Sequence, residues 1–527
     1  MMCLIGISRN CDGYLHDGLT VFSKSLILFV FFTGLSCCWV PLPIAYAKGE
    51  FEIQVVDRDT GQPLAVRMKV FNSRGRPQRV AGVLNWRGHF VFAGSVLLKL
   101  PDGLYQFEIE RGPEYKLRTG NFKIERGATD QRQVTMERFA TMKEEGWWSG
   151  DLHVARRPND IESLMLAEDL HVAAVTGWSN RSKKNYHGEV PVSFDQDRVY
   201  NLQVGEEYRV GGALRFFHLP DPIPTIPFNV EFPCSCQWLK RSRDVPGVHI
   251  DVVDPASWDF PVWIASGWIH SIALAVGELW SGAETGKQIG SRPYDKSIFI
   301  GEAGQMDWRQ YIYYQALNTG VRLPPSAGSA SGDCSNAVGH HRVYVQLDGE
   351  FSYENWWEGL KQGRVVITNG PLLRPSVEGQ SPGYVFQRDA GETLQLEMQL
   401  KLSTRYPVEY LELIQDGRVV HVVRLDQWAA KNGRLPPLTF NESGWFLVRA
   451  VAAERSNYRF ASSGPYYVQI GDQPKISRKS TQFFLDWIME RARNIEHNDD
   501  EQKREVLRYH RAARDYWQQK LNVANAP

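Results

Sequence analysis

The stretch Gly146-Trp-Trp-Ser-Gly-Asp-Leu-His153 decides how the central part of this chain is interpreted. Asp151 and His153 are two positions apart in an apolar segment, which predicts a strand with both side chains on one face. An imidazole beside carboxylates is a common way to bind a divalent metal, which generates a hydroxide nucleophile. A hydrogen-bonded Asp/His pair with a structural role explains the same spacing. Both interpretations stay open at this point.

The segments after this stretch combine helical and strand patterns. Glu162 to Leu170 has a helical, acidic pattern, and His171 to Thr176 is a short apolar run that is typical of a buried parallel strand. Helix followed by strand predicts an α/β region over residues 139–370.

The regions on either side have the period-two alternation of β-strands. Apolar and polar residues alternate over residues 51–55 and again over residues 394–402. At 527 residues the chain exceeds what one hydrophobic core organises, so several domains are expected. The expected order is a signal peptide (1–47), a β-sandwich (48–138), the α/β region (139–370), a second β-sandwich (371–471) and a C-terminal helical hairpin (472–527).

The N-terminal segment has the pattern of a secretory signal. An uncharged, apolar run from Ser25 ends at Ala45-Tyr46-Ala47, which is an A-x-A cleavage pattern. The run is long enough for a membrane anchor, but Pro41 and Pro43 oppose a continuous spanning helix. We therefore expect an extracytoplasmic protein, periplasmic or secreted, and a membrane-anchored protein is the alternative.

The charges exclude one class of partner. Sixty Lys and Arg residues balance sixty Asp and Glu residues. Without a net positive field we expect no nucleic-acid partner, and a membrane only where the N-terminal segment is retained as an anchor.

Together, Gly146 to His153 and Ala167 to Thr176 resemble the start of a PHP domain, of the polymerase and histidinol phosphatase type. The carbaryl-hydrolase-like (CehA/McbA) metallohydrolases are similar. Further similarity lies in Trp258–His270, Leu323–Gly332 and Gly363–Pro371, so the resemblance covers roughly residues 140–470. It implies a distorted β/α barrel with a polynuclear metal centre that hydrolyses esters or phosphoesters. Asp151 and His153 would then lie at the mouth of the first barrel strand.

The ligands that this resemblance implies carry over only in part. His153 matches the first His of the family's His-x-His, but Ala155 replaces the second. Gly177-Trp178 stands where an Asp-His pair would follow, and Ser329-Ala330-Ser331 stands where an Asp-x-His would align. Small and apolar side chains cannot ligate a cation, so the usual trinuclear site is not expected.

A reduced metal site remains as an interpretation. Gly205-Glu206-Glu207 matches the family's Gly-x-Glu, which makes Glu207 a candidate ligand, and His249 is a looser candidate. With His153 they would give three protein ligands for zinc, manganese or iron, and Asp151 would orient His153. The site could equally hold no metal.

Three further side chains are candidates for contact with a ligand. Trp178 could stack on a sugar ring or fill the core. Arg156 and Arg157 could hold a phosphate or carboxylate, with Arg156 a candidate catalytic residue, or they could be a solvated loop pair. Two functions follow. One is an exported PHP-like hydrolase with a reduced metal site, acting on a small molecule or glycan. The alternative is an inactive PHP-like protein that binds glycans or proteins outside the cytoplasm.

Overall fold

A computed structural model of the chain describes residues 49–181, 186, 191–222, 226–227, 229–277, 290–301, 303–453 and 458–527. Strands make up 40% of the structure and helices 22%, so β-structure dominates. The expected signal peptide lies outside the described residues. In the part that is described, no helix is both long and apolar enough to cross a bilayer.

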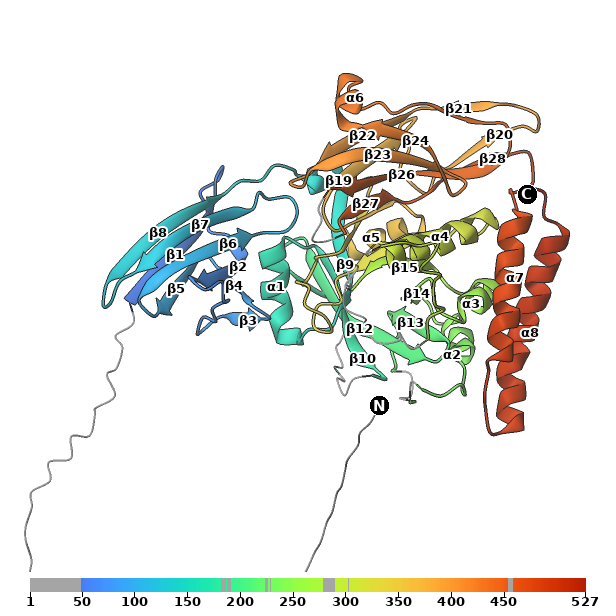
Figure 1. Cartoon of the computed structure of the whole chain (residues 1–527), viewed down its shortest axis with the longest axis horizontal. Helices are drawn as coiled ribbons and strands as arrows, with labels where there is room; N and C mark the ends of the chain where they lie inside the picture. The colour runs from blue at the N-terminus through green and yellow to red at the C-terminus, as the bar shows by residue number, and fades with distance from the viewer. Residues whose placement is uncertain are drawn as a thin grey trace, which may run out of the picture. The chain divides into compact units, whose positions relative to one another are not determined.

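The N-terminal strands form two sheets that share one core (Figure 1). One sheet has the order β5-β1-β8 and the other β3-β4-β2-β6-β7. Phe51, Ile53 and Val55 alternate with partly exposed residues along β1, so the period-two pattern faces the core. The strands are β1 (Gly49–Asp57), β2 (Ala65–Asn72), β3 (Leu84–Trp86), β4 (His89–Ala93), β5 (Ser95–Leu100), β6 (Gly103–Glu110), β7 (Arg118–Ile124) and β8 (Thr129–Met136).

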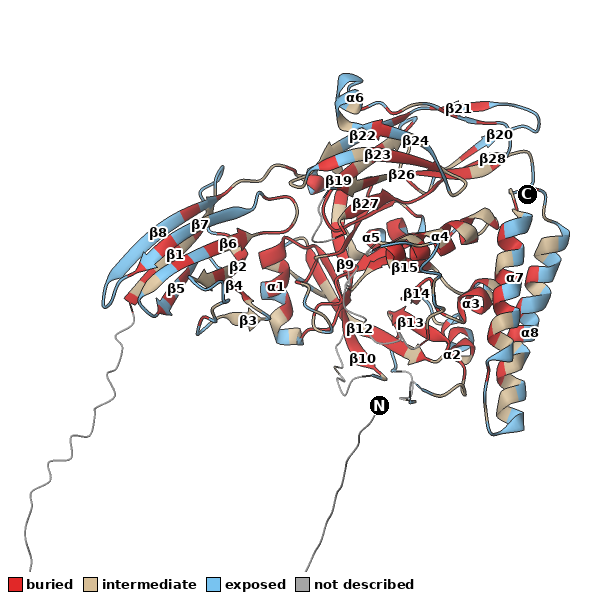
Figure 2. Ribbon diagram, viewed as in Figure 1, coloured by how far each residue is buried: buried red, intermediate tan, exposed pale blue. Residues whose placement is uncertain are grey.

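The central region contributes ten strands to one large sheet. They are β9 (Trp147–Val154), β10 (Val172–Ser179), β11 (Val192–Phe194), β12 (Arg198–Arg209), β13 (Gly212–Phe217), β14 (His249–Val252), β15 (Ser271–Val276), β16 (Pro325–Gly328), β17 (Arg342–Gln346) and β18 (Val365–Thr368). Its α-helices are α1 (Ile161–Glu168), α2 (Ser235–Ser242), α3 (Phe260–Ser266), α4 (Gly304–Asn318) and α5 (Tyr353–Lys361), and the 3-10 helices are η1 (Met142–Glu145) and η2 (Pro158–Asp160). Figure 2 shows these strands almost entirely in the buried colour.

The expected β/α barrel is wrong, because the described strands do not close into one. The ladder ends at β16 on one side, and beyond β9 it continues into β17 and β18 instead of returning to β16. One isolated bridge, between Val154 and Ser331, stands where closure would need a ladder. The direction of the strands also departs from a β/α barrel, since β13 runs antiparallel to both β12 and β14, and β17 antiparallel to β9.

The C-terminal strands continue the same sheet. We expected a separate β-sandwich here, but β27 pairs with β18 and so joins its neighbours to the central sheet. Smaller two-stranded sheets, β19-β22 and β21-β25, complete this region. The elements are β19 (Leu372–Val377), β20 (Val385–Arg388), β21 (Leu394–Leu396), β22 (Met398–Ser403), β23 (Val408–Gln415), β24 (Arg418–Arg424), α6 (Leu425–Ala430), β25 (Leu438–Phe440), β26 (Gly444–Ala452), β27 (Phe460–Ser463) and β28 (Tyr466–Ile470).

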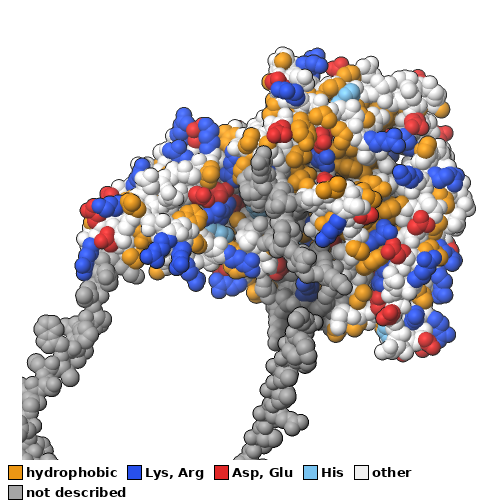
Figure 3. Space-filling model, in the orientation of Figure 1, with side chains coloured by type: hydrophobic (Ala, Val, Ile, Leu, Met, Phe, Trp, Pro, Cys, Tyr) orange, Lys and Arg blue, Asp and Glu red, His pale blue; other side chains and the backbone are white. Residues whose placement is uncertain are grey.

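Two helices end the chain, α7 (Arg478–Arg493) and α8 (Asp500–Asn522), and they lie side by side (Figure 1). Phe484 stacks on Trp517 between them, with ring centroids 4.9 Å apart. Arg491 donates to Asp259 beside α3 at 2.9 Å, which ties α7 to the central region. The outward residues of α8 are exposed in Figure 2. On the face shown in Figure 3, basic and acidic side chains are interspersed.

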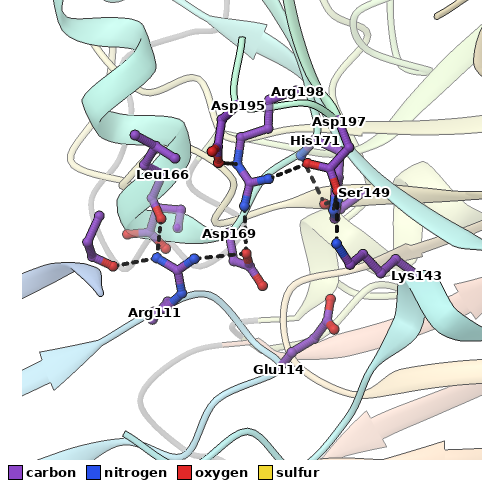
Figure 4. Close-up of polar contacts among 12 residues, drawn as sticks. Arg111, Glu114, Lys143, Ser149, Leu166, Asp169, His171, Asp195, Asp197 and Arg198 are labelled. Carbon is purple, nitrogen blue, oxygen red and sulfur yellow. Dashed lines mark hydrogen bonds and ion pairs between the residues drawn. The ribbon is translucent and has the colours of Figure 1, made fainter. Parts of the chain in front are cut away.

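A buried carboxylate joins the N-terminal sheets to the central region (Figure 4). Asp169, in a left-handed conformation at the end of α1, accepts hydrogen bonds from three arginines. Arg111 lies 3.1 Å away, Arg138 2.5 Å and Arg198 2.8 Å. Arg111 follows β6, Arg138 follows β8 and Arg198 begins β12, so one acidic group holds three segments.

We expect Asp169→Asn to lower the free energy of unfolding by about 3 to 5 kcal/mol, because it leaves buried guanidinium groups without their carboxylate. Urea unfolding followed by tryptophan fluorescence measures the change. The matched control is Asp195→Asn, since Asp195 is about half exposed and pairs with Arg198 at 3.6 Å. An exposed pair contributes less than about 1 kcal/mol. Equal effects of the two substitutions would contradict the role of Asp169.

Candidate metal centre

His153 is a buried imidazole whose two ring nitrogens both lack a hydrogen-bond partner within the described structure. It lies near the end of β9, and its Nε2 faces two carboxylates. Glu206 Oε1 is 3.4 Å from this nitrogen and Asp333 Oδ2 is 3.3 Å from it. A buried nitrogen without a partner is costly, so a further group between these atoms would stabilise the site.

The three side chains form a potential metal-binding triad. Their nearest ligand atoms all lie within 4.8 Å of one another, and they are the one such group among the residues that the structure describes. One imidazole nitrogen and two carboxylate oxygens are a usual donor set for zinc, manganese or iron. His153 and Glu206 are buried and Asp333 is exposed, so one side of the triad is open to solvent. The residues present therefore fit a single divalent cation.

Glu206 is held in place by donors from its own sheet. Arg215 Nη2 donates to its Oε1 at 2.7 Å, and Tyr208 Oη donates to the same oxygen at 2.8 Å. Burial raises the pKa of Glu206, but its contacts with His153 and Arg215 together outweigh burial, and the net pKa lies below its ordinary value. Glu206 is therefore ionised at neutral pH, as a metal ligand must be.

Asp151 positions the loop that carries Asp333. This fully buried carboxylate on β9 accepts hydrogen bonds from the Ser329 and Gly339 backbone N–H groups at 2.8 and 2.7 Å. It also accepts from the Ser329 hydroxyl at 2.5 Å and from the His153 N–H at 3.0 Å. Burial raises the pKa of Asp151, and these donors oppose that rise. Asp151 thus fixes both ends of the segment that contains Asp333, and does not orient the ring of His153.

Glu207, which the sequence predicted as a ligand, is not brought to His153. Neighbouring residues of a strand point to opposite faces, so Glu206 and Glu207 on β12 diverge. Glu207 accepts from Arg209 Nε at 2.8 Å on the other face, and burial raises its pKa to about 7. The resemblance pointed to Glu207, but Glu206 is the member of this pair that faces His153. The pattern Gly-x-Glu alone does not state which of two neighbouring residues lies on the same face of the sheet as His153.

His249 also lies away from the triad. Its Nε2 is 2.7 Å from Ser271 Oγ, and its ring packs near His270 and Trp357, with centroids 5.2 and 5.1 Å away. Asp333 was not predicted at all. It follows β16 in a loop with no strand or helix pattern. Hydrogen bonds to Asp151, together with the bond from the Ala155 N–H to the Ser331 carbonyl at 2.7 Å, bring that loop to His153.

The other three predicted site residues have separate environments. Arg156 is buried, with its guanidinium carbon 4.1 Å from the centroid of the Trp86 ring. Arg157 is exposed and pairs with Asp160 at 3.1 Å. Trp178 is buried in the core, where it covers Gly205 so closely that a Cβ there would lie 1.7 Å from the ring. Within the described residues, Arg156, Arg157 and Trp178 therefore have different partners: an aromatic ring, a carboxylate and the core.

We expect Asp151→Asn to destabilise the chain by about 1 to 3 kcal/mol, because an amide group would face donors that now have an acceptor. The midpoint of chemical unfolding measures this effect. Asp130→Asn is the control, since Asp130 is exposed on β8 and its loss should change stability by less than about 0.5 kcal/mol. If both variants unfold like the parent, Asp151 does not hold the loop.

A pH dependence follows from His341, a fully buried imidazole beside Gly328. Burial lowers its pKa to about 3 in the folded chain, against 6.5 for an exposed histidine. The stability that neutral His341 contributes is complete above pH 6.5 and is lost as pH falls from 6.5 toward 3. At pH 4.5 the loss reaches about 2 to 3 kcal/mol.

His341→Asn keeps a donor for the Gly328 carbonyl and removes the titration. Unfolding midpoints at pH 7.5 and 4.5 should therefore differ less in this variant than in the parent. The same difference in both proteins would show that His341 does not titrate as its burial requires.

Comparisons with known proteins do not assign this chain to a family. No family model matches the sequence, and no match is found among curated proteins. Among solved structures, fibronectin(III)-like modules of Clostridium thermocellum CbhA are similar over 19% of this chain and 96% of theirs, at 14% identity and a TM-score of 0.14. The apo structure of Bacteroides uniformis β-glucuronidase 3 is similar over 82% of this chain and 64% of its own, at 11% identity and a TM-score of 0.15.

Proposed function

We propose that this protein is an exported hydrolase that cleaves esters or phosphoesters at one divalent cation held by His153, Glu206 and Asp333. The observation that carries the proposal is the buried Nε2 of His153, which lacks a hydrogen-bond partner in the described structure and faces two carboxylates. The resemblance of residues 146–153 and 167–176 to PHP hydrolases supports the reaction class, and the apolar run before Ala47 supports export.

The ligand set supports metal-assisted hydrolysis by a single ion. Zinc, manganese or iron bound here would supply a Lewis acid and lower the pKa of a coordinated water. The side chains of the protein have distinct tasks. Arg215 and Tyr208 hold Glu206 against the imidazole, and Asp151 holds the loop of Asp333. Because Asp333 is the exposed member, a small-molecule or glycan substrate would approach from its side.

One observation favours the second candidate, a metal-free binding protein. Arg215 is fully buried and already pairs with the Glu206 oxygen that faces His153. Its positive charge opposes a divalent cation nearby, and the ion pair satisfies much of the charge of Glu206 without a metal. In that case the chain would bind a glycan or protein without catalysis.

Elemental analysis of the purified full chain decides between these candidates. After equilibration with zinc, manganese or iron and removal of free ions, we expect about one equivalent in the parent. His153→Ala and Glu206→Gln should each lower metal occupancy at least tenfold, because each removes one of three ligands. Glu207→Gln is the matched control and should retain the metal, since its side chain pairs with Arg209.

Each outcome of this experiment supports one candidate and contradicts the other. A parent without stoichiometric metal overturns the metallohydrolase proposal and supports the binding protein. Metal that is retained by Glu206→Gln and lost in Glu207→Gln would instead support the ligand set expected from the sequence. Hydrolysis of p-nitrophenyl acetate and bis-p-nitrophenyl phosphate, each with added metal, then tests ester and phosphoester chemistry in the same variants.

A further inference from the structure

A cavity of about 340 Å³ lies beside the loop that carries Asp333. Three regions form its walls: the N-terminal sheets, the segment from Ser335 to His340, and the C-terminal strands. It is a site apart from the triad, because none of His153, Glu206 and Asp333 lines it.

Its lining is strongly basic. Two glutamates, Glu110 and Glu168, face six cationic side chains across the cavity. The cationic residues are Arg67, Lys69, Arg87, Arg342, Arg405 and Arg459. Bringing cations this close together costs free energy unless an anion offsets their repulsion.

The two carboxylates are already engaged by part of this set. Arg67 Nε lies 2.5 Å from Glu168, and its Nη2 lies 3.2 Å from Glu110. Arg405 Nη2 lies 2.7 Å from the same Glu110 oxygen, and Arg342 Nη2 lies 3.8 Å from Glu168. Neither of these two glutamates is therefore left to pair with Lys69 or Arg87.

Lys69 and Arg87 lie where they can reach a ligand. Lys69 is partly buried and pairs at 3.2 Å with Glu108, which does not line the cavity. Arg87 is exposed in the turn between β3 and β4 and lies over the Trp86 ring. Arg459 donates to the Asn369 carbonyl at 2.8 Å. Long cationic side chains at the rim and wall are the arrangement that recognises oxyanions.

Two histidines complete the lining, His89 and His340. Burial and the charges of Arg67 and Arg156 lower the pKa of His89 to about 3. Burial, His341 and Arg459 hold the pKa of His340 well below its ordinary value. Both rings are neutral at pH 7, so each offers an N–H donor, and neither ring hydrogen-bonds another described residue.

We propose that this cavity binds an oxyanion with two negative charges, either free phosphate or sulfate or the phosphate group at the end of a monoester. Guanidinium groups donate two parallel hydrogen bonds to such an oxyanion, and the divalent charge offsets more of the repulsion than a carboxylate would. This anion site does not depend on a metal at the triad. Anion binding can therefore be measured directly, without an assay of catalytic activity.

Thermal unfolding and calorimetric titration of the full chain test the proposal. Sodium phosphate and sodium sulfate should raise the unfolding temperature relative to sodium chloride at equal ionic strength, and acetate should have a smaller effect. Lys69→Gln/Arg87→Gln should weaken phosphate binding at least tenfold. Lys99→Gln, an exposed residue on β5 outside the cavity, is the matched control and should bind like the parent.

The single variant Arg87→Gln distinguishes a loss of binding from a folding defect, because this side chain is exposed and its replacement should not change stability. It should unfold like the parent without anion and still bind phosphate at least threefold more weakly. The proposal fails if no anion stabilises the parent beyond chloride, if acetate binds as tightly as phosphate, or if the cavity variants bind like the parent. If phosphate binds, the affinity for glucose 6-phosphate distinguishes the two sources. Tighter binding of glucose 6-phosphate than of phosphate identifies a monoester site, and equal or weaker binding identifies a site for the free ion.

Discussion

The buried carboxylate of Asp151 is the interaction on which the candidate site depends. A carboxylate loses much of its hydration in the interior, and only several well-placed donors offset that cost. Asp151 has four, and three of them belong to Ser329 and Gly339, far along the chain. Because these donors enclose the loop that contains Asp333, the same group that satisfies Asp151 also brings an acidic side chain to His153. The contacts that stabilise this loop therefore also contribute to the geometry of the triad.

The strands around the triad approach closely because glycines lie under large aromatic rings. A Cβ at Gly150 would lie 2.3 Å from the Trp356 ring. A Cβ at Gly205 would collide in the same way with the Trp178 ring. Both glycines lie within a few residues of the triad, Gly150 on β9 and Gly205 on β12. The aromatic side chains thus fill the core, while the next residues along each strand present His153 and Glu206 to one another.

Buried arginine networks connect the N-terminal sheets to the rest of the structure. Asp169 binds three arginines, and Arg67 bridges Glu110 of β6 and Glu168 of α1. Removing one partner of such a pair is strongly destabilising, because it leaves a buried charge unpaired. The cost of that unpaired charge is larger than the stabilisation that the intact pair provides. The basic cavity differs from the Asp169 network in that its lining carries more cations than carboxylates, and this excess is what distinguishes a binding site from a structural network.

The sequence by itself determined local pattern. An apolar segment predicted the strand that carries Asp151 and His153, and alternation predicted β-structure in the N-terminal and C-terminal regions. The resemblance to PHP domains implied a closed barrel, but the sheet is open and mixed. Local pattern could not correct this expectation, because it does not contain the order or direction of strands. Nor does it contain the pairing between strands. Glu206 rather than Glu207 meets His153 because of the register of β12, and Asp333 arrives through hydrogen bonds to Asp151 from a residue 178 positions away. Only tertiary structure decided these contacts, because each depends on atoms that are distant in the chain.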